Sequence, residues 1–213
     1  MQALAYSPNM VKLAVANSDK VITLYDQNFQ KKDKIPTRGA KKGSKNYLIK
    51  SIAFSPDSTI IAVAQTDNII YGYRIGSEWG EKKSICTKIP ASSPVTTMIW
   101  PIETLHELYF GTAEGQVRIG FVKNHKSQAL YSTNSYVVSL ASGRQNKYLI
   151  SGHLDGSIFL YNTETKTYKK LITAPTVPYA LGFGKHIFLA GNDNTVTVMA
   201  QNGNIIQKFD YQS

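Results

Sequence analysis

The chain contains an internal repeat, and this repeat restricts its fold more than any other feature of the sequence. Residues 3–26 (ALAYSPNMVKLAVANSDKVITLYD) align without a gap with residues 51–74 (SIAFSPDSTIIAVAQTDNIIYGYR) at an offset of 48 residues. The identical pairs are Ala5/Ala53, Ser7/Ser55, Pro8/Pro56, Ala14/Ala62, Val15/Val63, Ala16/Ala64, Asp19/Asp67, Ile22/Ile70 and Tyr25/Tyr73. Weaker copies begin at Val95, Val137 and Tyr179. A period of about 40–50 residues is typical of architectures in which each copy is one supersecondary unit, so five units are predicted.

Each copy has the pattern of four short β-strands. Its first apolar run is closed by Ser-Pro-Asn or Ser-Pro-Asp in the first two copies, where proline fixes the corner of a turn. A second run rich in Ala, Val and Ile follows, and then a short polar turn (NSDK, QTDN, TAEG, HLDG or NDNT) that tolerates unusual dihedral angles. A third run and a more variable fourth run complete the copy. Because no copy shows a sustained helical period, the sequence predicts antiparallel sheets.

Four strands per copy at this spacing predict an all-β fold of the WD40-like β-propeller type, with five four-stranded blades. The blades are expected at approximately residues 2–36, 48–90, 95–131, 136–173 and 178–211 of one domain that spans residues 1–213. The WD40 signature is degraded, because the only Gly-His pair is Gly152-His153 and the third strands end in Tyr25-Asp26, Tyr73-Arg74 and Tyr161-Asn162. Small residues on the second strands are predicted to be buried where sheets approach closely, namely Ala14, Ala16, Ala62 and Ala64.

The number of copies predicts an incomplete propeller. Seven blades at this period need about 290 residues, whereas the chain has 213. We therefore expect a part of a larger propeller of about seven blades, and the repeat is compatible both with an open arc and with a tightened ring of five. As an incomplete propeller, the chain is expected to expose apolar faces of its first and last blades and to self-associate.

Positive charge is concentrated in one stretch of the chain. Residues 31–50 hold eight Lys and Arg against one Asp, a net charge of +7, whereas the whole chain carries +10. The protein is therefore not basic throughout, as a nucleic-acid-coating protein tends to be. Cys86 is the only cysteine, so no internal disulfide can form. The sequence shows no secretory signal and no apolar stretch of membrane-spanning length, which predicts a cytoplasmic protein without a transmembrane segment.

The motifs that resemble chemical sites lack the spacing or the residues that such sites require. Gly39 and Gly43 lie one residue too close together for a phosphate-binding loop, and Lys45 follows a serine instead of the second glycine. The histidines show no spacing that would gather metal ligands, and His153 is expected in a turn with local hydrogen bonds. No nucleophile motif is present. We therefore expect no enzyme, no catalytic residues, no cofactor and no metal site.

The basic stretch divides at Pro36 into two parts. The first part reads as the charged outer strand of the first blade, with Lys31, Lys32 and Lys34 as an accessory basic edge. The second part, residues 37–46, reads as a flexible loop between blades whose candidate partner-binding residues are Arg38, Lys41, Lys42 and Lys45. Such a loop is either a solvated connection or a docking surface for an acidic protein surface or anionic lipid. Nucleic acid is not expected, because Tyr47 is the only interleaved aromatic residue.

Several segments resemble the N-terminal WD40 propeller of the intraflagellar transport protein 172 family. They are AFSPDSTIIAVAQTDNIIYGYRIGSEWGEKKSIC (53–86), AEGQVR (113–118), SYVVSL (135–140), SGHLDGSI (151–158), PYAL (178–181) and FDY (209–211). The resemblance extends in order over nearly the whole chain, and the QTDNIIY and EWGEKK pieces are not generic blade sequence.

The resemblance implies a function that the composition does not reveal. It implies a non-enzymatic scaffold within a subunit of the intraflagellar transport B complex, acting in cilium assembly and ciliary cargo transport. The implied partners are other subunits of that complex, including a calponin-homology-containing subunit. The implied locations are the cytoplasm, the cilium or flagellum and the basal body. Peripheral binding to an anionic membrane through the basic loop is the alternative prediction.

Overall fold

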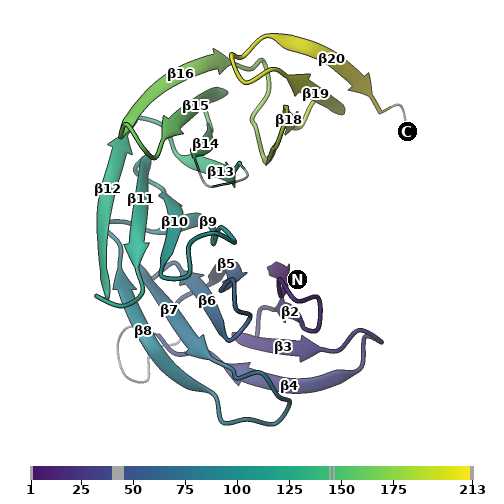
Figure 1. Ribbon diagram of the computed structural model, residues 1–213, viewed down its shortest axis with the longest axis vertical. Coiled ribbons are helices and arrows are strands. Elements are labelled where there is room, and N and C mark those ends of the chain that lie inside the picture. The colour runs from purple at the N-terminus through teal and green to yellow at the C-terminus, as the bar shows by residue number, and fades with distance from the viewer. Residues whose placement is uncertain (1, 40–45, 144, 146, 212–213) are drawn as a thin grey trace. The chain divides into compact units, whose positions relative to one another are not determined.

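The computed structural model describes residues 2–39, 46–143, 145 and 147–211, and every regular element in them is a β-strand (Figure 1). No α-helix occurs in these described residues. The strands form five four-stranded sheets in which the spatial order follows the chain. The predicted all-β fold with five four-stranded sheets is therefore confirmed.

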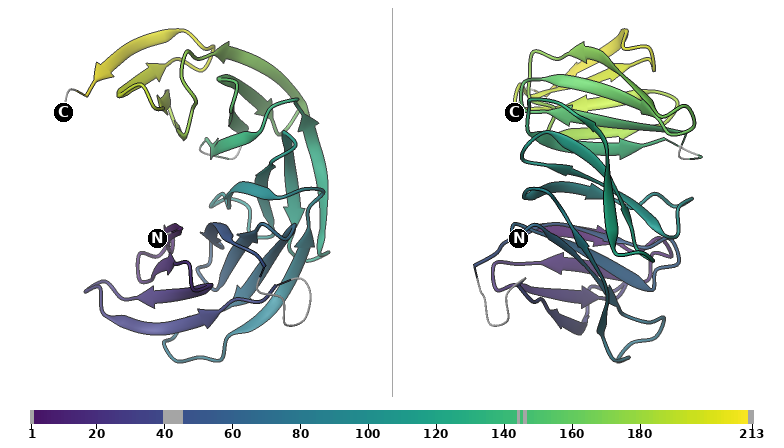
Figure 2. Two further views of the ribbon diagram at one scale, coloured as in Figure 1. Left: turned by 180° about the vertical axis from the view of Figure 1, so that it is seen from behind. Right: turned by 90° about the vertical axis from the view of Figure 1, so that its left-hand side faces the viewer.

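Each sheet is built from four consecutive strands, seen from two further directions in Figure 2. The first sheet contains β1 (Ala3–Tyr6), β2 (Leu13–Ala16), β3 (Val21–Tyr25) and β4 (Lys31–Pro36). The second contains β5 (Ile49–Phe54), β6 (Ile60–Gln65), β7 (Ile69–Arg74) and β8 (Ser84–Pro90). The third contains β9 (Val95–Ile99), β10 (Glu107–Thr112), β11 (Gln116–Phe121) and β12 (Lys126–Ser132). The fourth contains β13 (Val137–Ser142), β14 (Tyr148–His153), β15 (Ser157–Asn162) and β16 (Thr167–Thr173). The fifth contains β17 (Ala180–Phe183), β18 (Ile187–Ala190), β19 (Thr195–Met199) and β20 (Ile205–Asp210).

The turn between the second and third strands has the same backbone feature in all five sheets. One residue in each of these turns has a positive φ, between 56° and 83°: Lys20, Asn68, Gly115, Gly156 and Asn194. Glycine and asparagine adopt this left-handed conformation at low cost, which explains the composition of these turns. At Gly115 and Gly156 a Cβ would also lie 2.4 Å from a backbone carbonyl oxygen, so a larger residue would be excluded by contact as well.

The chain divides into two compact units, the first made of residues 1–110 and 119–128 and the second of residues 111–118 and 129–213. In the first unit, the first two sheets share a core in which Ala14 and Ala16 are completely buried against a cluster that includes Ile52, Phe54 and Val63. The small side chains let the sheets approach closely.

The next core of the first unit repeats this arrangement one sheet further along the chain. Ala62 and Ala64 are fully buried in a cluster with Trp100, Leu108 and Phe110. Burial of the four alanines of the second strands is thus confirmed.

In the second unit, the fourth and fifth sheets bury apolar side chains of both in one cluster. Ile150 and Ile158 contribute from the fourth sheet, and Ile187, Leu189 and Met199 contribute from the fifth. All five are at most 3% exposed. This face-to-face packing is the expected arrangement of stacked antiparallel sheets.

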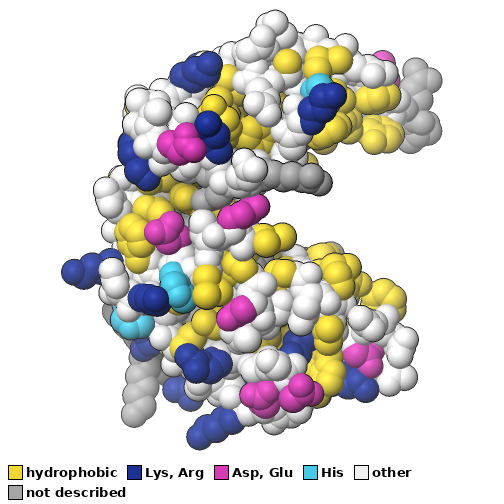
Figure 3. Space-filling view, in the orientation of Figure 1, with side chains coloured by type: hydrophobic (Ala, Val, Ile, Leu, Met, Phe, Trp, Pro, Cys, Tyr) yellow, Lys and Arg dark blue, Asp and Glu magenta, His cyan; other side chains and the backbone are white. Residues whose placement is uncertain are grey.

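Two sheet faces carry exposed apolar side chains. On the first sheet, Leu4 and Tyr6 are 52% and 43% exposed. On the fifth sheet, Phe188 and Phe209 are each 46% exposed, and the register places them on the face opposite Leu189. Hydrophobic side chains are visible at the surface over this last sheet (Figure 3). Exposed apolar faces of this kind favour association.

We predict that the isolated chain self-associates through these faces. Replacing Phe188 and Phe209 by serine should shift the population toward monomer, because it removes apolar surface that only association can bury. Size-exclusion chromatography with light scattering measures the shift. The matched control replaces Ile102 and Leu105, which are also exposed, by serine. This control should change the fraction of monomer little. A monodisperse monomer of the unaltered chain would contradict the prediction.

Candidate interaction surface

The first residues of the predicted basic loop are fastened to the sheets by hydrogen bonds. Thr37 Oγ1 donates to the Lys20 carbonyl at 2.6 Å and lies 2.9 Å from the Tyr47 hydroxyl. The Arg38 backbone N–H donates to the Tyr73 hydroxyl at 3.1 Å. Burial raises the pKa of Tyr73 to about 12, so this hydroxyl stays protonated at neutral pH. The loop thus begins at a fixed point, and a contact between Thr37 and Tyr47 joins its first residue to the residue that follows the loop.

The predicted loop residues are only partly described by the structure. Arg38 is exposed at the start of the loop. Lys41, Lys42 and Lys45 lie outside the described residues. A contact surface made of these four residues therefore stays a prediction, supported by the anchoring of its base.

The predicted basic edge lies on β4, and its three lysines have different surroundings. Lys32 forms a salt bridge with Asp26 at 3.2 Å, and Asp26 also accepts hydrogen bonds from two backbone N–H groups that help to lower its pKa. Lys31 and Lys34 are exposed on one face of the strand, where their cross-strand partners are Tyr25 and Thr23. The like charge of the neighbouring Lys34 ammonium lowers the pKa of Lys31. Two of the three lysines thus form a pair of neighbouring exposed cations.

A buried lysine, which the sequence analysis did not identify, joins the first two sheets. Lys12 is 2% exposed, and its ammonium group donates to the carbonyl oxygens of Gly76 and Ser77 at 3.0 and 2.6 Å. The same nitrogen lies 5.1 Å from the centre of the Trp79 ring, within range of a cation–π interaction. Burial lowers the pKa of Lys12, an effect that the negative charges of Glu81 and Glu78 oppose.

The single acid of the basic stretch completes this connection. Asp33 accepts hydrogen bonds from Lys83 Nζ at 2.6 Å and from the Gly80 backbone N–H at 3.1 Å. Burial by itself raises the pKa of Asp33, but these two donors outweigh it and the pKa is lowered. The EWGEKK segment, residues 78–83, is therefore a structural element that fastens the second sheet to the first. Its unusual sequence was the signal, but the sequence did not show what it contacts.

We predict that Lys12→Ala lowers the free energy of unfolding by about 2–3 kcal/mol, because two charged hydrogen bonds and a packed side chain are lost. Lys12→Met should recover part of that loss by restoring the packing. Chemical denaturation measures both. Lys50→Ala, at an exposed position, is the control and should change stability by less than about 0.5 kcal/mol. Equal effects at Lys12 and Lys50 would show that the carbonyl contacts contribute nothing.

The expectation for His153 is wrong in its placement. His153 is the last residue of β14, not a turn residue, and it is completely buried. Its Nδ1 lies 2.9 Å from the Ser135 carbonyl and 3.0 Å from Thr133 Oγ1, and its Nε2 lies 2.7 Å from Ser151 Oγ. Ser151 in turn accepts a hydrogen bond from the Tyr131 hydroxyl at 2.7 Å. Because β14 extends one residue further than the turn pattern suggests, the imidazole contacts Thr133 and Ser135, which are distant in sequence, and Ser151 of its own strand instead of its own turn.

The buried imidazole makes stability depend on pH. Burial lowers the pKa of His153, although the hydrogen bond to Ser135 and the charge of Asp155 raise it in part. Below its ordinary pKa of about 6.5 the unfolded chain binds a proton that the folded chain does not, so stability falls as pH decreases. We predict a decreasing melting temperature from pH 7.5 toward pH 5.5. His153→Gln should reduce the dependence of the melting temperature on pH. His106→Gln, at an exposed position, should leave this dependence unchanged. An unchanged slope in His153→Gln would contradict the assignment.

Among the residues that the structure describes, no three His, Cys, Asp or Glu side chains lie close enough to hold a metal ion. Within the same residues, no helix is long and apolar enough to cross a membrane.

Comparison with known sequences places the chain in a class. A sequence model for the anaphase-promoting complex subunit 4 WD40 domain matches residues 4–103, and a model for the WD domain, G-beta repeat, matches residues 124–162. Together with the five four-stranded sheets, these matches define a WD40-repeat protein of the β-propeller type, as predicted.

Similarity to individual proteins covers almost the whole chain. Intraflagellar transport protein 172 of Chlamydomonas reinhardtii is 44% identical over 99% of this chain, and its homologues in Homo sapiens and Danio rerio are 44% and 47% identical over 98%. The predicted resemblance to the N-terminal WD40 region of the intraflagellar transport protein 172 family is thereby confirmed. The chain spans only 12–13% of the length of these relatives.

Proposed function

We propose that the chain is a non-enzymatic protein-interaction module of an intraflagellar transport B complex subunit, acting in cilium assembly and ciliary cargo transport. One observation carries the proposal, namely the similarity over 98–99% of the chain to proteins named for intraflagellar transport. The WD40 class supports a binding role, because stacked four-stranded sheets present extended surfaces for partners.

The relatives' names support a location and a set of partners for this module. We propose that it acts in the cytoplasm and at the cilium or flagellum, including the basal body. Its partners would be other subunits of the same complex, with a calponin-homology-containing subunit among them.

The contact surface that we propose is the basic loop of residues 37–46, with Arg38, Lys41, Lys42 and Lys45 as its cations and Lys31 and Lys34 beside it. Three features support it. The loop base is anchored by Thr37 and Arg38, Arg38 is exposed, and two β4 lysines remain outside salt bridges among the described residues. A fixed base and a cationic sequence suit an acidic protein surface, since charge complementarity mainly increases association rate and specificity. Peripheral binding to an anionic membrane, the alternative, gains no support from the relatives' names.

Charge reversal tests the contact surface. Changing Arg38, Lys41, Lys42 and Lys45 to Glu should reduce recovery of B-complex partners in a pull-down by about tenfold, and raised salt should weaken binding of the unaltered chain. The matched control reverses four exposed lysines elsewhere, Lys123, Lys126, Lys185 and Lys208, and should retain binding. Equal recovery with both variants would reject the loop as the contact, whereas no recovery of these partners by the unaltered chain would reject the proposed function itself.

A further inference from the structure

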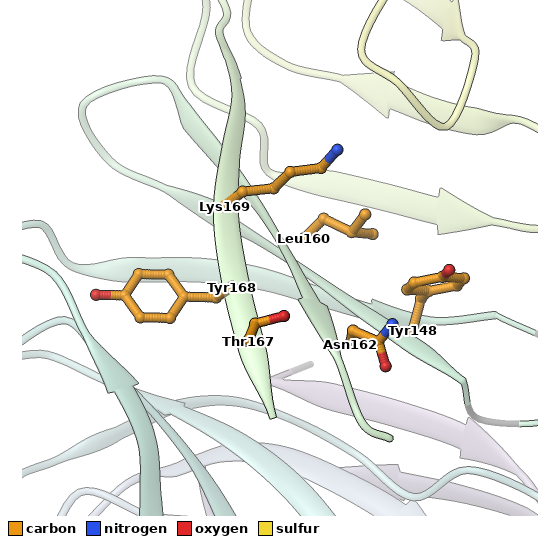
Figure 4. Close-up of a pocket in the computed structure, with 6 residues that line it drawn as sticks. All are labelled: Tyr148, Leu160, Asn162, Thr167, Tyr168 and Lys169. Atoms are coloured by element: carbon orange, nitrogen blue, oxygen red, sulfur yellow. The ribbon is translucent and has the colours of Figure 1, made fainter. Parts of the chain in front are cut away.

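A groove of about 290 Å³ lies on the fourth sheet, in the second compact unit. It is lined by Tyr148, Leu160, Asn162, Thr167, Tyr168 and Lys169, which come from β14, β15 and β16 (Figure 4). This volume is near the lower end for ligand pockets, so it suits one or two side chains better than a larger ligand.

The pairing register explains why five of these side chains share one face. Tyr148, Asn162 and Thr167 are cross-strand partners in one row, and Leu160 and Lys169 are partners in the adjacent row of the same face. Figure 4 shows Lys169 directed to the side of Leu160 and Tyr148.

Tyr168 is directed to the opposite side of the sheet in Figure 4. There its ring stacks on that of Tyr131, with the centroids 4.6 Å apart. This ring therefore does not contribute its face to the groove.

The apolar part of the groove is held in place by its neighbours. Leu160 is only 9% exposed. The Tyr148 ring meets Phe183 edge to face at 6.4 Å, and the Lys147 ammonium lies 5.9 Å from the centre of the same ring. An aliphatic side-chain stem can therefore rest on an ordered surface of Leu160 and Tyr148.

The polar part of the groove is rich in hydrogen-bond donors. Asn162 Oδ1 accepts hydrogen bonds from the backbone N–H groups of Glu164 and Thr165 at 2.9 and 3.1 Å. Its amide oxygen is thus used within the turn, and the NH₂ group is what Asn162 can offer to a ligand. Lys169 adds an ammonium group that forms no salt bridge among the described residues. Together these donors match a carboxylate.

The charge around the groove favours the same kind of ligand. Between residues 157 and 192 the chain has four lysines and one acid, Glu164. Glu164 is engaged by Lys147, at 3.2 Å, which lies just outside this range. Of these four lysines, Lys170 lies on the opposite face of β16, so Lys169 and Lys166, in the turn just before β16, are the cations that complement an acidic partner here.

We propose that this groove binds an acidic segment of a partner protein, with one glutamate side chain seated in it. The carboxylate contacts the Lys169 ammonium and the Asn162 NH₂ group, and the methylene stem packs on Tyr148 and Leu160. The contact is separate from the basic loop of residues 37–46 and does not depend on the identity of the complex in which the protein works.

The groove can be tested with a fluorescent peptide of about twelve residues in which Glu and Ser alternate. Fluorescence anisotropy measures the affinity of this peptide for the unaltered chain. The same peptide with Gln in place of Glu is the ligand control. Lys169→Glu should weaken binding of the acidic peptide by about tenfold. Thr167→Trp, which fills the groove without changing charge, should weaken it to a similar extent.

Lys170→Glu is the matched control variant. Lys170 pairs with Phe159 in the register and therefore lies on the opposite face of β16, so the same change of charge should reduce affinity by no more than about twofold. All three positions are exposed, and an unchanged melting temperature checks the fold.

Three results would overturn the proposal. The first is that the acidic peptide does not bind. The second is that Lys169→Glu and Lys170→Glu reduce the affinity for the peptide equally, which would indicate a non-specific effect of the surface charge. The third is a single-stranded oligonucleotide that binds more tightly than the peptide and loses affinity in both groove variants, which would assign the groove to another polyanion.

Discussion

Close packing between neighbouring sheets is the interaction on which the rest of this structure depends. Each four-stranded sheet is too small to bury its own apolar residues, so an inner face must be covered by the next sheet. Ala14, Ala16, Ala62 and Ala64 have no exposed surface because larger side chains of the adjoining sheet fill the space above them. The same requirement explains the small residues that the first two copies place on their second strands.

Polar contacts add direction to this packing. Apolar faces can pack in several relative positions, whereas hydrogen bonds require particular partners. Lys12 donates to the carbonyl oxygens of Gly76 and Ser77. Asp33 accepts hydrogen bonds from Lys83 and Gly80. Buried charges tolerate few alternatives, because an unpaired one costs far more than a misplaced methyl group. These contacts set how the first two sheets are registered, and the anchored base of the basic loop lies at the same junction.

The sequence predicted the sheets better than it predicted the polar sites. Strand periodicity and the turns at Lys20, Asn68, Gly115, Gly156 and Asn194 are local properties, and local sequence encodes them directly. The candidate loop was recognised from charge alone, and of its four cations the structure describes only Arg38. His153 was misplaced because one additional residue of strand carries its side chain from a turn into the core, a difference that composition does not reveal.

The sequence by itself determined the repeat, the four strands of each copy, the local concentration of charge and the resemblance to intraflagellar transport proteins. These depend on neighbours in the chain or on direct comparison of residues. Only the tertiary structure decided which charges are neutralised, that EWGEKK fastens two sheets, and that Tyr148, Leu160, Asn162 and Lys169 share a groove. Such contacts join residues that lie on different strands or sheets. Strand pairing sets the register and the direction of each side chain, and these decide whether two such residues are in contact.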